Sequence, residues 1–247
     1  MAQQLLKTKF HLPVARADVV RRPRLTGLID RGLKGRLTLI AAPAGAGKST
    51  LVSEWRESKE GRGRRFAWLS LDEADNDPIR FFTYLVTALD GIRPGIGDVA
   101  VSLFQASNIG ADRGEILTAL INEIAEIDHD FVLGLDDYHV ITDEQIHGMM
   151  TTFIENMPPQ MHLLIATRHD PPLPLARMRA RGDLTEIRGA DLQFDAGETA
   201  AMLAAAEELD LPETVVADLT VRTEGWAAGL HLFVLSVRGR KLSVAEL

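Results

Sequence analysis

A glycine-rich turn between two apolar stretches carries the residues whose types and spacing best suit chemistry. Residues 42–50 read APAGAGKST, directly after the apolar run LTLIA and before LVSEW. In such a turn backbone N–H groups surround phosphate oxygens, and glycines let the anion approach closely. Ala42 replaces the first glycine of the usual pattern, but the core GAGKST is present. The pattern therefore predicts a phosphate-binding loop; the alternative is an ordinary strand-to-helix turn with an exposed lysine.

The side chains at the end of this loop indicate a nucleotide that is bound together with a divalent cation. Lys48 is expected to neutralise the β- and γ-phosphates, and the hydroxyl of Ser49 is expected to bind Mg²⁺. The predicted nucleotide contacts in the loop are Ala44, Gly45, Ala46, Gly47, Lys48, Ser49 and Thr50.

Charged residues also follow two apolar runs further along the chain. Residues 131–137 read FVLGLDD, an apolar run that ends in two carboxylates. Asp136 is predicted to hold Mg²⁺ and Asp137 to orient or deprotonate the attacking water, although a turn or a helix cap is the other interpretation. Arg168 follows the run LLIAT and is predicted to contact the γ-phosphate, with an ion pair to Asp170 as the alternative.

A parallel sheet is needed to position these residues. Apolar runs alternate with helix-like stretches, which is typical of an α/β fold with a doubly wound parallel sheet. The predicted strands are 37–41, 66–71, 131–135, 162–166 and 184–187, with the probable order 5-1-4-3-2. Ligands of such sheets bind outside the carboxyl ends of the strands, which is where the loop, the two acids and the arginine are expected to lie.

Helix signals occur between the predicted strands. An apolar face over 113–127 predicts a helix that begins at Asp112. Thr142 is expected to cap the helix that follows the two acids. Residues 91–110 contain several glycines and little periodicity, so this stretch is predicted to be a surface excursion between two helices.

The composition changes after about residue 193, where no further strand-like run appears. Three helices are predicted there, separated near Pro212 and Gly225, and the first begins with Asp195 and Glu198 at capping-box spacing. The predicted division is an N-terminal arm of the nucleotide site over 1–30, a P-loop nucleotide-binding domain over 31–192 and a small helical domain over 193–247.

Composition restricts the class of protein. The chain has 247 residues, no cysteine and a formal net charge of −8. This length supports a substantial core, and the lack of cysteine excludes disulfides and thiolate metal sites. The negative charge disfavours direct binding of nucleic acid, which depends on clustered Lys and Arg. Without a signal pattern or a long apolar run, a cytoplasmic protein that does not interact with membranes is expected.

Motifs spread along almost the whole chain resemble those of one family of P-loop ATPases. The chain is similar to the nucleotide-binding module of the signal-transduction ATPases with numerous domains (STAND), specifically to the MalT-like branch of LuxR-type transcription regulators. The motifs are VVRRPRL, LTLIAAPAGAGKSTLVSEW, AWLSLDEADNDPIRFFTYL, LGLDDYHVI, LLIATRHDPPLPLARMRARGDLTEI and TEGWAAGLHL. The resemblance implies an AAA-like P-loop NTPase fold, ATP or ADP with Mg²⁺ as ligands, and a role in signal transduction and transcription regulation.

The resemblance also implies contacts outside the loop. In the family, the segment that matches VVRRPRL lies against the adenine, so Val20, Arg21 and Arg24 are expected to contact the base or a phosphate; a solvated basic arm is the alternative. The two carboxylates and the downstream arginine match the family's Walker B acids and sensor arginine. Residues 225–227 match an element of the family's helical domain but lack its proline, so Trp226 is expected to be a core residue rather than part of the site.

The function that follows is an ATP/ADP-controlled regulatory switch with slow, Mg²⁺-dependent hydrolysis, which self-associates or acts with further domains. Relatives continue into winged-helix, sensor and DNA-binding domains, so the chain is either a fragment or a reduced family member. The alternative is a stand-alone P-loop ATPase or small-molecule kinase, with RMRARGD at 177–183 as its lid. A third interpretation is an interaction module whose nucleotide is permanently bound.

Overall fold

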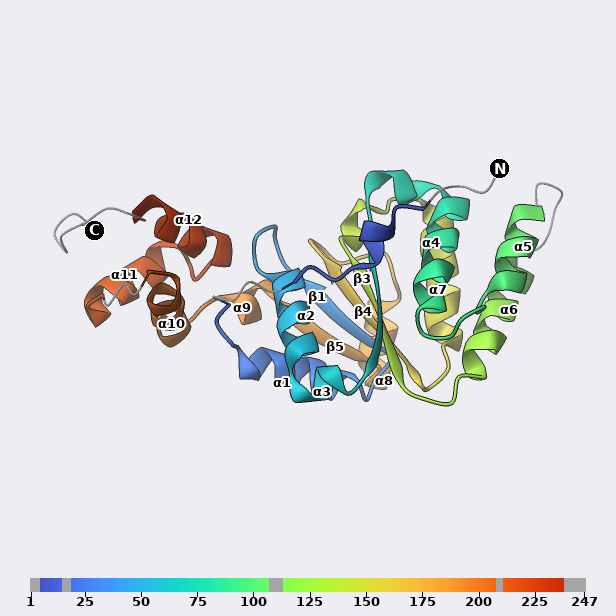
Figure 1. The fold of residues 1–247 in the computed structure, drawn as a ribbon, viewed down its shortest axis with the longest axis horizontal. Helices are drawn as coiled ribbons and strands as arrows, with labels where there is room; N and C mark the ends of the chain where they lie inside the picture. Colours follow the sequence, from blue (N-terminus) through green and yellow to red (C-terminus); the bar gives the residue numbers. More distant parts are fainter. Residues whose placement is uncertain (1–4, 15–18, 107–112, 208–210, 238–247) are drawn as a thin grey trace.

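A five-stranded parallel sheet forms the centre of the protein. The computed structural model describes residues 5–14, 19–106, 113–207 and 211–237. The sheet order β2-β3-β4-β1-β5 confirms the predicted order, read from the opposite edge (Figure 1). The strands are β1 (Leu37–Ala41), β2 (Arg65–Ser70), β3 (Phe131–Asp136), β4 (Met161–Thr167) and β5 (Leu184–Arg188).

Helices cover both faces of this sheet. Those of the sheet region are α1 (Pro23–Gly32), α2 (Lys48–Glu57), α3 (Lys59–Arg62), α4 (Pro78–Asp90), α5 (Asp98–Ala106), α6 (Arg113–Ala125), α7 (Glu144–Asn156), α8 (Leu175–Arg181) and α9 (Gly189–Leu192). Short 3₁₀ turns are η1 (Lys7–Phe10), η2 (Glu73–Asn76) and η4 (Tyr138–Val140). In the described part of the chain, no helix combines the length and the apolar character that a membrane crossing requires.

The core consists of two layers, one on each face of the sheet. Helices α1 and α2 pack on one face, whereas α4, α6, α7 and α8 pack on the other. Neighbouring residues of a strand alternate between the layers: Leu163 and Ile165 of β4 join the second layer, and Leu164 joins the first. Because both faces are covered, the strands are continuous apolar runs, and this explains why the sequence revealed them.

The helices differ from the sequence-based expectation in two respects. The segment predicted to be a surface excursion over 91–110 contains helix α5, which packs against α6 after two glycines with positive φ. Helix α7 is capped by Asp143 rather than Thr142, because the Asp143 carboxylate accepts hydrogen bonds from the N–H groups of Gln145 and Ile146 at 2.9 and 3.0 Å. The predicted cap Asp112 lies outside the described residues, while helix α6 is present as expected.

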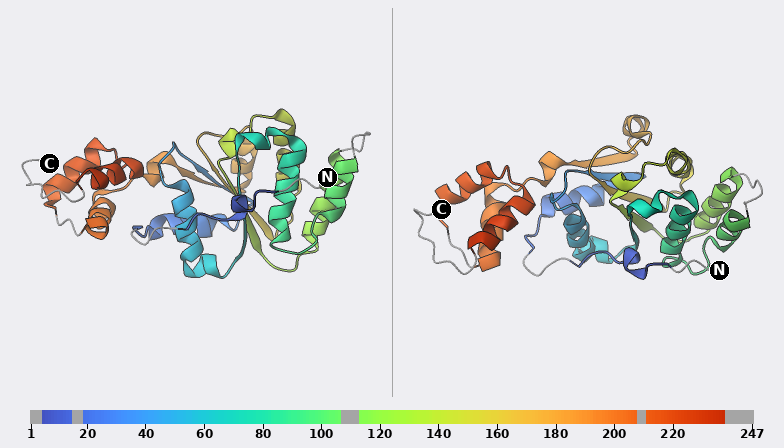
Figure 2. Two further views of the ribbon diagram at one scale, coloured as in Figure 1. Left: turned by 45° about the horizontal axis from the view of Figure 1, so that its top comes forward. Right: turned by 90° about the horizontal axis from the view of Figure 1, so that it is seen from above.

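Beyond the sheet, the chain forms three helices, as predicted: α10 (Ala196–Glu207), α11 (Glu213–Arg222) and α12 (Ala227–Val237). Figures 1 and 2 show these helices together at one end of the molecule, beyond α9. They have an apolar cluster of their own, formed by Leu203, Val216, Leu219, Leu230 and Val234. The predicted capping box is confirmed, since Glu198 N–H donates to Asp195 Oδ1 at 2.8 Å and Asp195 N–H to Glu198 Oε2 at 3.3 Å.

The N-terminal segment runs across the molecule before the first strand. Its 3₁₀ turn η1 packs against β2, and Lys9 there is buried in an ion pair with Asp75 and lies 4.6 Å from the Tyr84 ring centroid. The carbonyl of Pro13 accepts a hydrogen bond from Ser53 on α2 at 2.5 Å. The part of the arm that precedes the undescribed residues 15–18 is therefore fixed to the sheet region.

Candidate nucleotide-binding site

The predicted phosphate loop joins the buried strand β1 to helix α2. Gly45 and Gly47 have φ values of 73° and 87°, a left-handed conformation that side chains other than glycine disfavour. Gly47 is the N-cap of α2, so the first N–H groups of that helix have no intrahelical partner. Unpaired N–H groups at a helix N-terminus, together with the helix dipole, favour a bound anion. The loop therefore has the local structure that a phosphate requires.

Lys48 is buried, unlike the exposed lysine of an ordinary turn. Its Nζ donates hydrogen bonds to the carbonyls of Ala42 and Pro43 at 2.9 and 3.1 Å. Burial lowers the pKa of this ammonium group, while the nearby Asp137 and Asp136 act in the opposite direction. The cation is thus held inside the loop, where it would meet the outer phosphates.

The two predicted acids lie at the end of β3, beside the loop. The hydroxyl of Ser49 donates to Asp136 Oδ2 at 2.7 Å, so the two residues predicted to bind Mg²⁺ are in direct contact. Burial raises the pKa of Asp136, against the hydrogen bond from Ser49. Asp137 has a φ of 55° and is half exposed, and its carboxylate lies 3.7 Å from Nδ1 of His139. Asp137 is thus open to solvent, whereas Asp136 is buried and accepts the hydrogen bond from Ser49.

The arginine predicted to sense the γ-phosphate lies at the tip of β4. The register pairs Ala41 at the end of β1 with Thr167 at the end of β4, so Arg168 leaves the sheet beside the start of the loop. Burial lowers the pKa values of both Lys48 and His139, and the nearby positive charge of Arg168 adds to this lowering in each case. The alternative ion pair with Asp170 is not formed, because Asp170 pairs with Arg188.

A cavity of about 140 Å³ adjoins the loop at the N-terminus of α2. Apolar side chains dominate its wall, and residues far apart in the sequence contribute to it. Its lining is Val19, Val20, Arg22, Gly47, Thr50, Leu51, Glu54, Phe194, Met202, Ala227 and His231. A largely apolar cavity with a few polar groups, next to a phosphate loop, fits a nucleotide base.

Only part of the segment 20–24 reaches the cavity. Val20 lines it, whereas the exposed Arg21 and Arg24, also predicted to contact the base or a phosphate, do not line it. Arg24 instead pairs with Glu198 on α10. Arg22, which the sequence analysis did not select, is buried and lines the cavity. Neighbouring arginines in a polar segment look alike in sequence, so no signal distinguished Arg22 from the others.

Trp226 is also placed differently from the prediction. It is 44% exposed rather than a core residue, and its Nε1 donates a hydrogen bond to the carbonyl of Ala44 at 3.1 Å. Next to it, the N–H of Ala228 donates to the carbonyl of Gly45 at 3.0 Å. A Cβ added to Gly45 would lie 2.7 Å from the Ala228 methyl group. The start of α12 therefore packs on the phosphate loop, although the family's proline is absent.

The residues fit a nucleotide and Mg²⁺. Among the apolar side chains of the cavity wall lie Arg22, Thr50 and Glu54, whose polar groups a base can contact. The hydroxyl of Ser49 and the carboxylate of Asp136 are the oxygen ligands that Mg²⁺ prefers. Mg²⁺ would neutralise phosphate charge there. The described residues contain no group of three or more His, Cys, Asp or Glu side chains that could hold a metal ion.

The alternative lid at 177–183 lies at the other end of the sheet. Its last residue, Asp183, accepts hydrogen bonds from the start of β1 at Arg36 and Leu37, opposite the phosphate loop. Two of its arginines are paired with carboxylates, Arg177 with Glu155 and Arg179 with Glu186. This geometry gives no support to a lid of a small-molecule kinase.

Comparison with known proteins identifies relatives of this arrangement. The chain is 36% identical over 233 residues to the serine/threonine-protein kinase PknK of Mycobacterium tuberculosis, an alignment that covers 94% of this chain and 21% of the kinase. It is 34% identical over 234 residues to the HTH-type transcriptional regulator MalT of Yersinia enterocolitica, covering 95% of this chain and 25% of the regulator. No family model matches the chain. Over this region the chain is homologous to the MalT-like STAND ATPases.

A solved structure shares the fold. It is the STAND protein with a tetratricopeptide repeat sensor from Pyrococcus horikoshii, with a TM-score of 0.65 and 16% sequence identity over 90% of this chain and 31% of that one. The described sheet and helices therefore form a P-loop NTPase fold of the STAND type. The chain spans only about a fifth to a quarter of the length of the curated relatives named above. Together, homology and fold support a nucleotide-binding regulatory module.

Proposed function

We propose that this chain is an ATP/ADP-binding switch module with slow, Mg²⁺-dependent ATP hydrolysis. One observation carries the proposal: the helical segment α10–α12 contacts the phosphate loop and also lines the base cavity. Trp226 and Ala228 donate to loop carbonyls, while Met202 and Ala227 form part of the cavity wall. A nucleotide in this site would touch both parts of the chain. A ligand that contacts two parts can shift their arrangement if its two forms contact them differently.

The division of roles in the site supports slow hydrolysis. Ser49 and Asp136 would hold Mg²⁺, Lys48 would neutralise phosphate charge, and the exposed carboxylate of Asp137 would orient or accept a proton from water. Arg168 would stabilise charge on the γ-phosphate. We therefore expect turnover well below the roughly 1–100 s⁻¹ typical of kinases. If faster hydrolysis needs a second arginine at the γ-phosphate, a neighbouring subunit or a further domain would supply it.

Trp226 provides a direct test of the switch. The other two tryptophans, Trp55 and Trp68, are buried in the sheet region, whereas Trp226 joins α12 to the phosphate loop. ATP and ADP, each added with Mg²⁺, are expected to change the fluorescence of the wild-type chain differently. The difference should disappear in Trp226→Phe. Identical spectra with the two nucleotides at saturation would contradict the switch.

Two further measurements separate this function from its rivals. Steady-state phosphate release should be slow and should rise with protein concentration if a neighbouring subunit completes the site. Fast turnover that does not depend on concentration would favour a stand-alone ATPase. Purified chain should also exchange bound ADP for ATP, whereas nucleotide that never exchanges would indicate a permanently occupied interaction module.

A further inference from the structure

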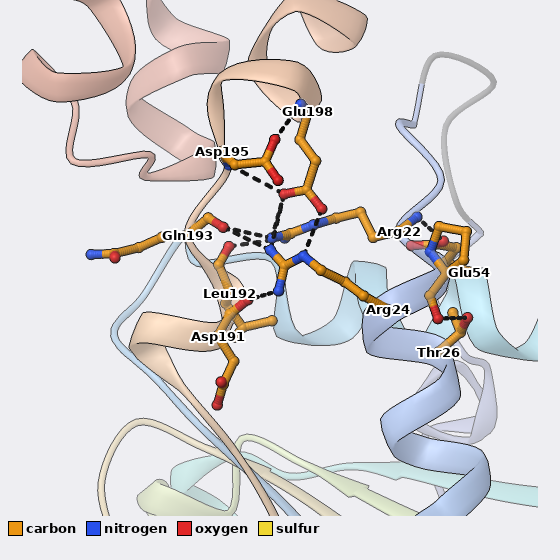
Figure 3. A network of polar contacts seen from close by, with 10 residues as sticks. Arg22, Arg24, Thr26, Glu54, Asp191, Leu192, Gln193, Asp195 and Glu198 are labelled. Atoms are coloured by element: carbon orange, nitrogen blue, oxygen red, sulfur yellow. Dashed lines mark hydrogen bonds and ion pairs between the residues drawn. The ribbon is translucent and has the colours of Figure 1, made fainter. Parts of the chain in front are cut away.

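One carboxylate of the helical segment holds two arginines of the N-terminal arm. Glu198, in the first turn of α10, accepts hydrogen bonds from Arg24 through both oxygens, from Nε at 2.9 Å and from Nη2 at 3.0 Å. It also forms an ion pair with Arg22, whose Nη2 lies 3.0 Å from Oε2. Figure 3 shows the three side chains converging between the arm and α10. We refer to Arg22, Arg24 and Glu198 as the arginine clasp.

The same arginines also bind the backbone that joins the sheet region to α10. Arg22 donates to the carbonyls of Leu192 and Gln193 at 2.9 and 2.8 Å, and Arg24 donates to that of Asp191 at 2.7 Å (Figure 3). Charge-assisted hydrogen bonds of this kind are stronger than neutral ones. The clasp therefore fixes where the helical segment begins relative to the arm.

Arg22 belongs to the clasp and to the base cavity at once. Its guanidinium lies 4.3 Å from the ring centroid of Phe194, another residue of the cavity wall. Its backbone N–H donates to the Glu54 carboxylate, so α2 holds the main chain while the clasp holds the side chain. Both terminal nitrogens are used in the clasp and its backbone contacts, whereas Nε is buried without a partner among the described residues. The clasp therefore holds the guanidinium of Arg22 in the cavity wall, next to Phe194.

We propose that Glu198 is a positioning residue for the nucleotide base: it holds the guanidinium of Arg22 against Phe194 in the wall of the cavity, where these two side chains contact the base. Because Glu198 lies on α10, recognition of the base then depends on where the helical segment lies. The phosphates are bound elsewhere, since in the described structure no hydrogen bond of the clasp reaches residues 42–50. This inference rests on the proposed nucleotide function.

The test compares ATP with inorganic tripolyphosphate, which has the phosphates but no base. Binding of each to the full chain, with Mg²⁺, is measured by calorimetry for the wild type and for Glu198→Gln. Glutamine retains the capping box of α10 but removes the charge that orients Arg22. We expect ATP affinity to fall by about tenfold, within the range of typical coupling between sites, while tripolyphosphate affinity is unchanged. A variant that was merely less well folded would lose both.

Glu186→Gln is the matched control. Glu186 on β5 likewise accepts hydrogen bonds from two arginines, Arg179 and Arg188, but it does not line the cavity. Its substitution should leave both affinities unchanged. If it lowers ATP affinity alone as Glu198→Gln does, the effect is not specific to the clasp and the inference is wrong.

Arg24→Gln provides a second variant in case Glu198→Gln does not fold. Arg24 is exposed and does not line the cavity, but it pairs with Glu198, so its loss should lower ATP affinity less than Glu198→Gln and again spare tripolyphosphate. Equal loss for both ligands, or no loss of ATP affinity in either variant, overturns the inference. A wild-type chain that binds neither ligand contradicts the proposed function instead.

Discussion

The phosphate end and the base end of the candidate site are built in different ways. The phosphate end consists of one loop of consecutive residues and the tips of adjacent strands, as in the 2.7 Å contact of Ser49 with Asp136. The base end combines the N-terminal arm, α2, the residue Phe194 and two helices of the helical segment. One end is therefore formed by the sheet region itself, whereas the other exists only while the helical segment is in place.

This difference has a functional consequence. The sheet is a single packed body, so rigid neighbours would set the position of the phosphates. The base would instead contact residues held by the arginine clasp and by α12, which belong to a separate apolar cluster. Substitutions at the phosphate end should thus affect ATP and tripolyphosphate alike, while those at the base end should affect ATP alone. The following predictions test that contrast.

The largest effect is expected at Lys48. Lys48→Ala removes the cation of the loop and should weaken both ATP and tripolyphosphate by about 100-fold or more, since hydrogen bonds between charged groups contribute about 1.5–3 kcal/mol each. Lys59→Ala, which removes an exposed lysine from α3, is the control and should change neither affinity. Calorimetry measures both ligands. Unchanged affinity in a folded Lys48→Ala chain would show that the loop does not bind phosphate.

The two acids should differ from each other within the phosphate end. Asp136→Asn is expected to weaken binding of both ligands by about tenfold with Mg²⁺ present and not in its absence, because the buried carboxylate proposed to hold the ion is lost. Asp137→Asn should leave affinity unchanged and lower ATP turnover, at least about tenfold, because general-base catalysis is lost. Binding with and without Mg²⁺ and phosphate release are the measurements. Equal loss of affinity in both variants would refute separate roles.

Gly225→Ala tests how strongly the base end depends on the helical segment. Gly225 has a φ of 62°, and a Cβ there would lie 2.4 Å from the carbonyl oxygen of Phe194 in the cavity wall. Gly182→Ala is matched to it, with a φ of 74° but no atom within 4 Å of the added Cβ. The left-handed conformation costs about 1–2 kcal/mol in either variant.

The steric overlap should make Gly225→Ala the less stable of the two in urea denaturation. It should also lower ATP affinity several-fold without changing tripolyphosphate affinity, because Phe194 must move. Gly182→Ala should bind both ligands as the wild type does. Equal stability and equal binding in the two variants would mean that the contact between Gly225 and Phe194 does not support the cavity.

The smallest effect is expected at Trp226, which joins the two ends. Trp226→Phe keeps an aromatic ring but removes the hydrogen bond from Nε1 to the Ala44 carbonyl. A single hydrogen bond of this kind contributes about 1 kcal/mol, so ATP affinity should fall by about fivefold at most. Because that carbonyl belongs to the phosphate loop, calorimetry should show an equally small loss for tripolyphosphate. A loss for ATP alone would assign Trp226 to the base end instead.

Much of the phosphate end was predictable from the sequence because residues close together in the chain determine its structure. The loop follows from glycines that permit positive φ at positions 45 and 47, beside a lysine and a serine. The strands follow from apolar runs that are buried on both faces. Helix α5 was not predicted. The glycines before it resemble a loop in the sequence, and the helix packs against α6, a contact that the nearby sequence does not reveal.

The amino-acid sequence by itself determined the parallel sheet, the loop that follows its first strand, and the acids and arginine at neighbouring strand ends. These features depend on residues close together in the chain or on the shared direction of parallel strands. Only the tertiary structure decided that Arg22 rather than Arg21 or Arg24 lines the cavity, and that Trp226 lies on the phosphate loop. The physical reason is that burial and hydrogen-bond partners there come from segments more than a hundred residues away.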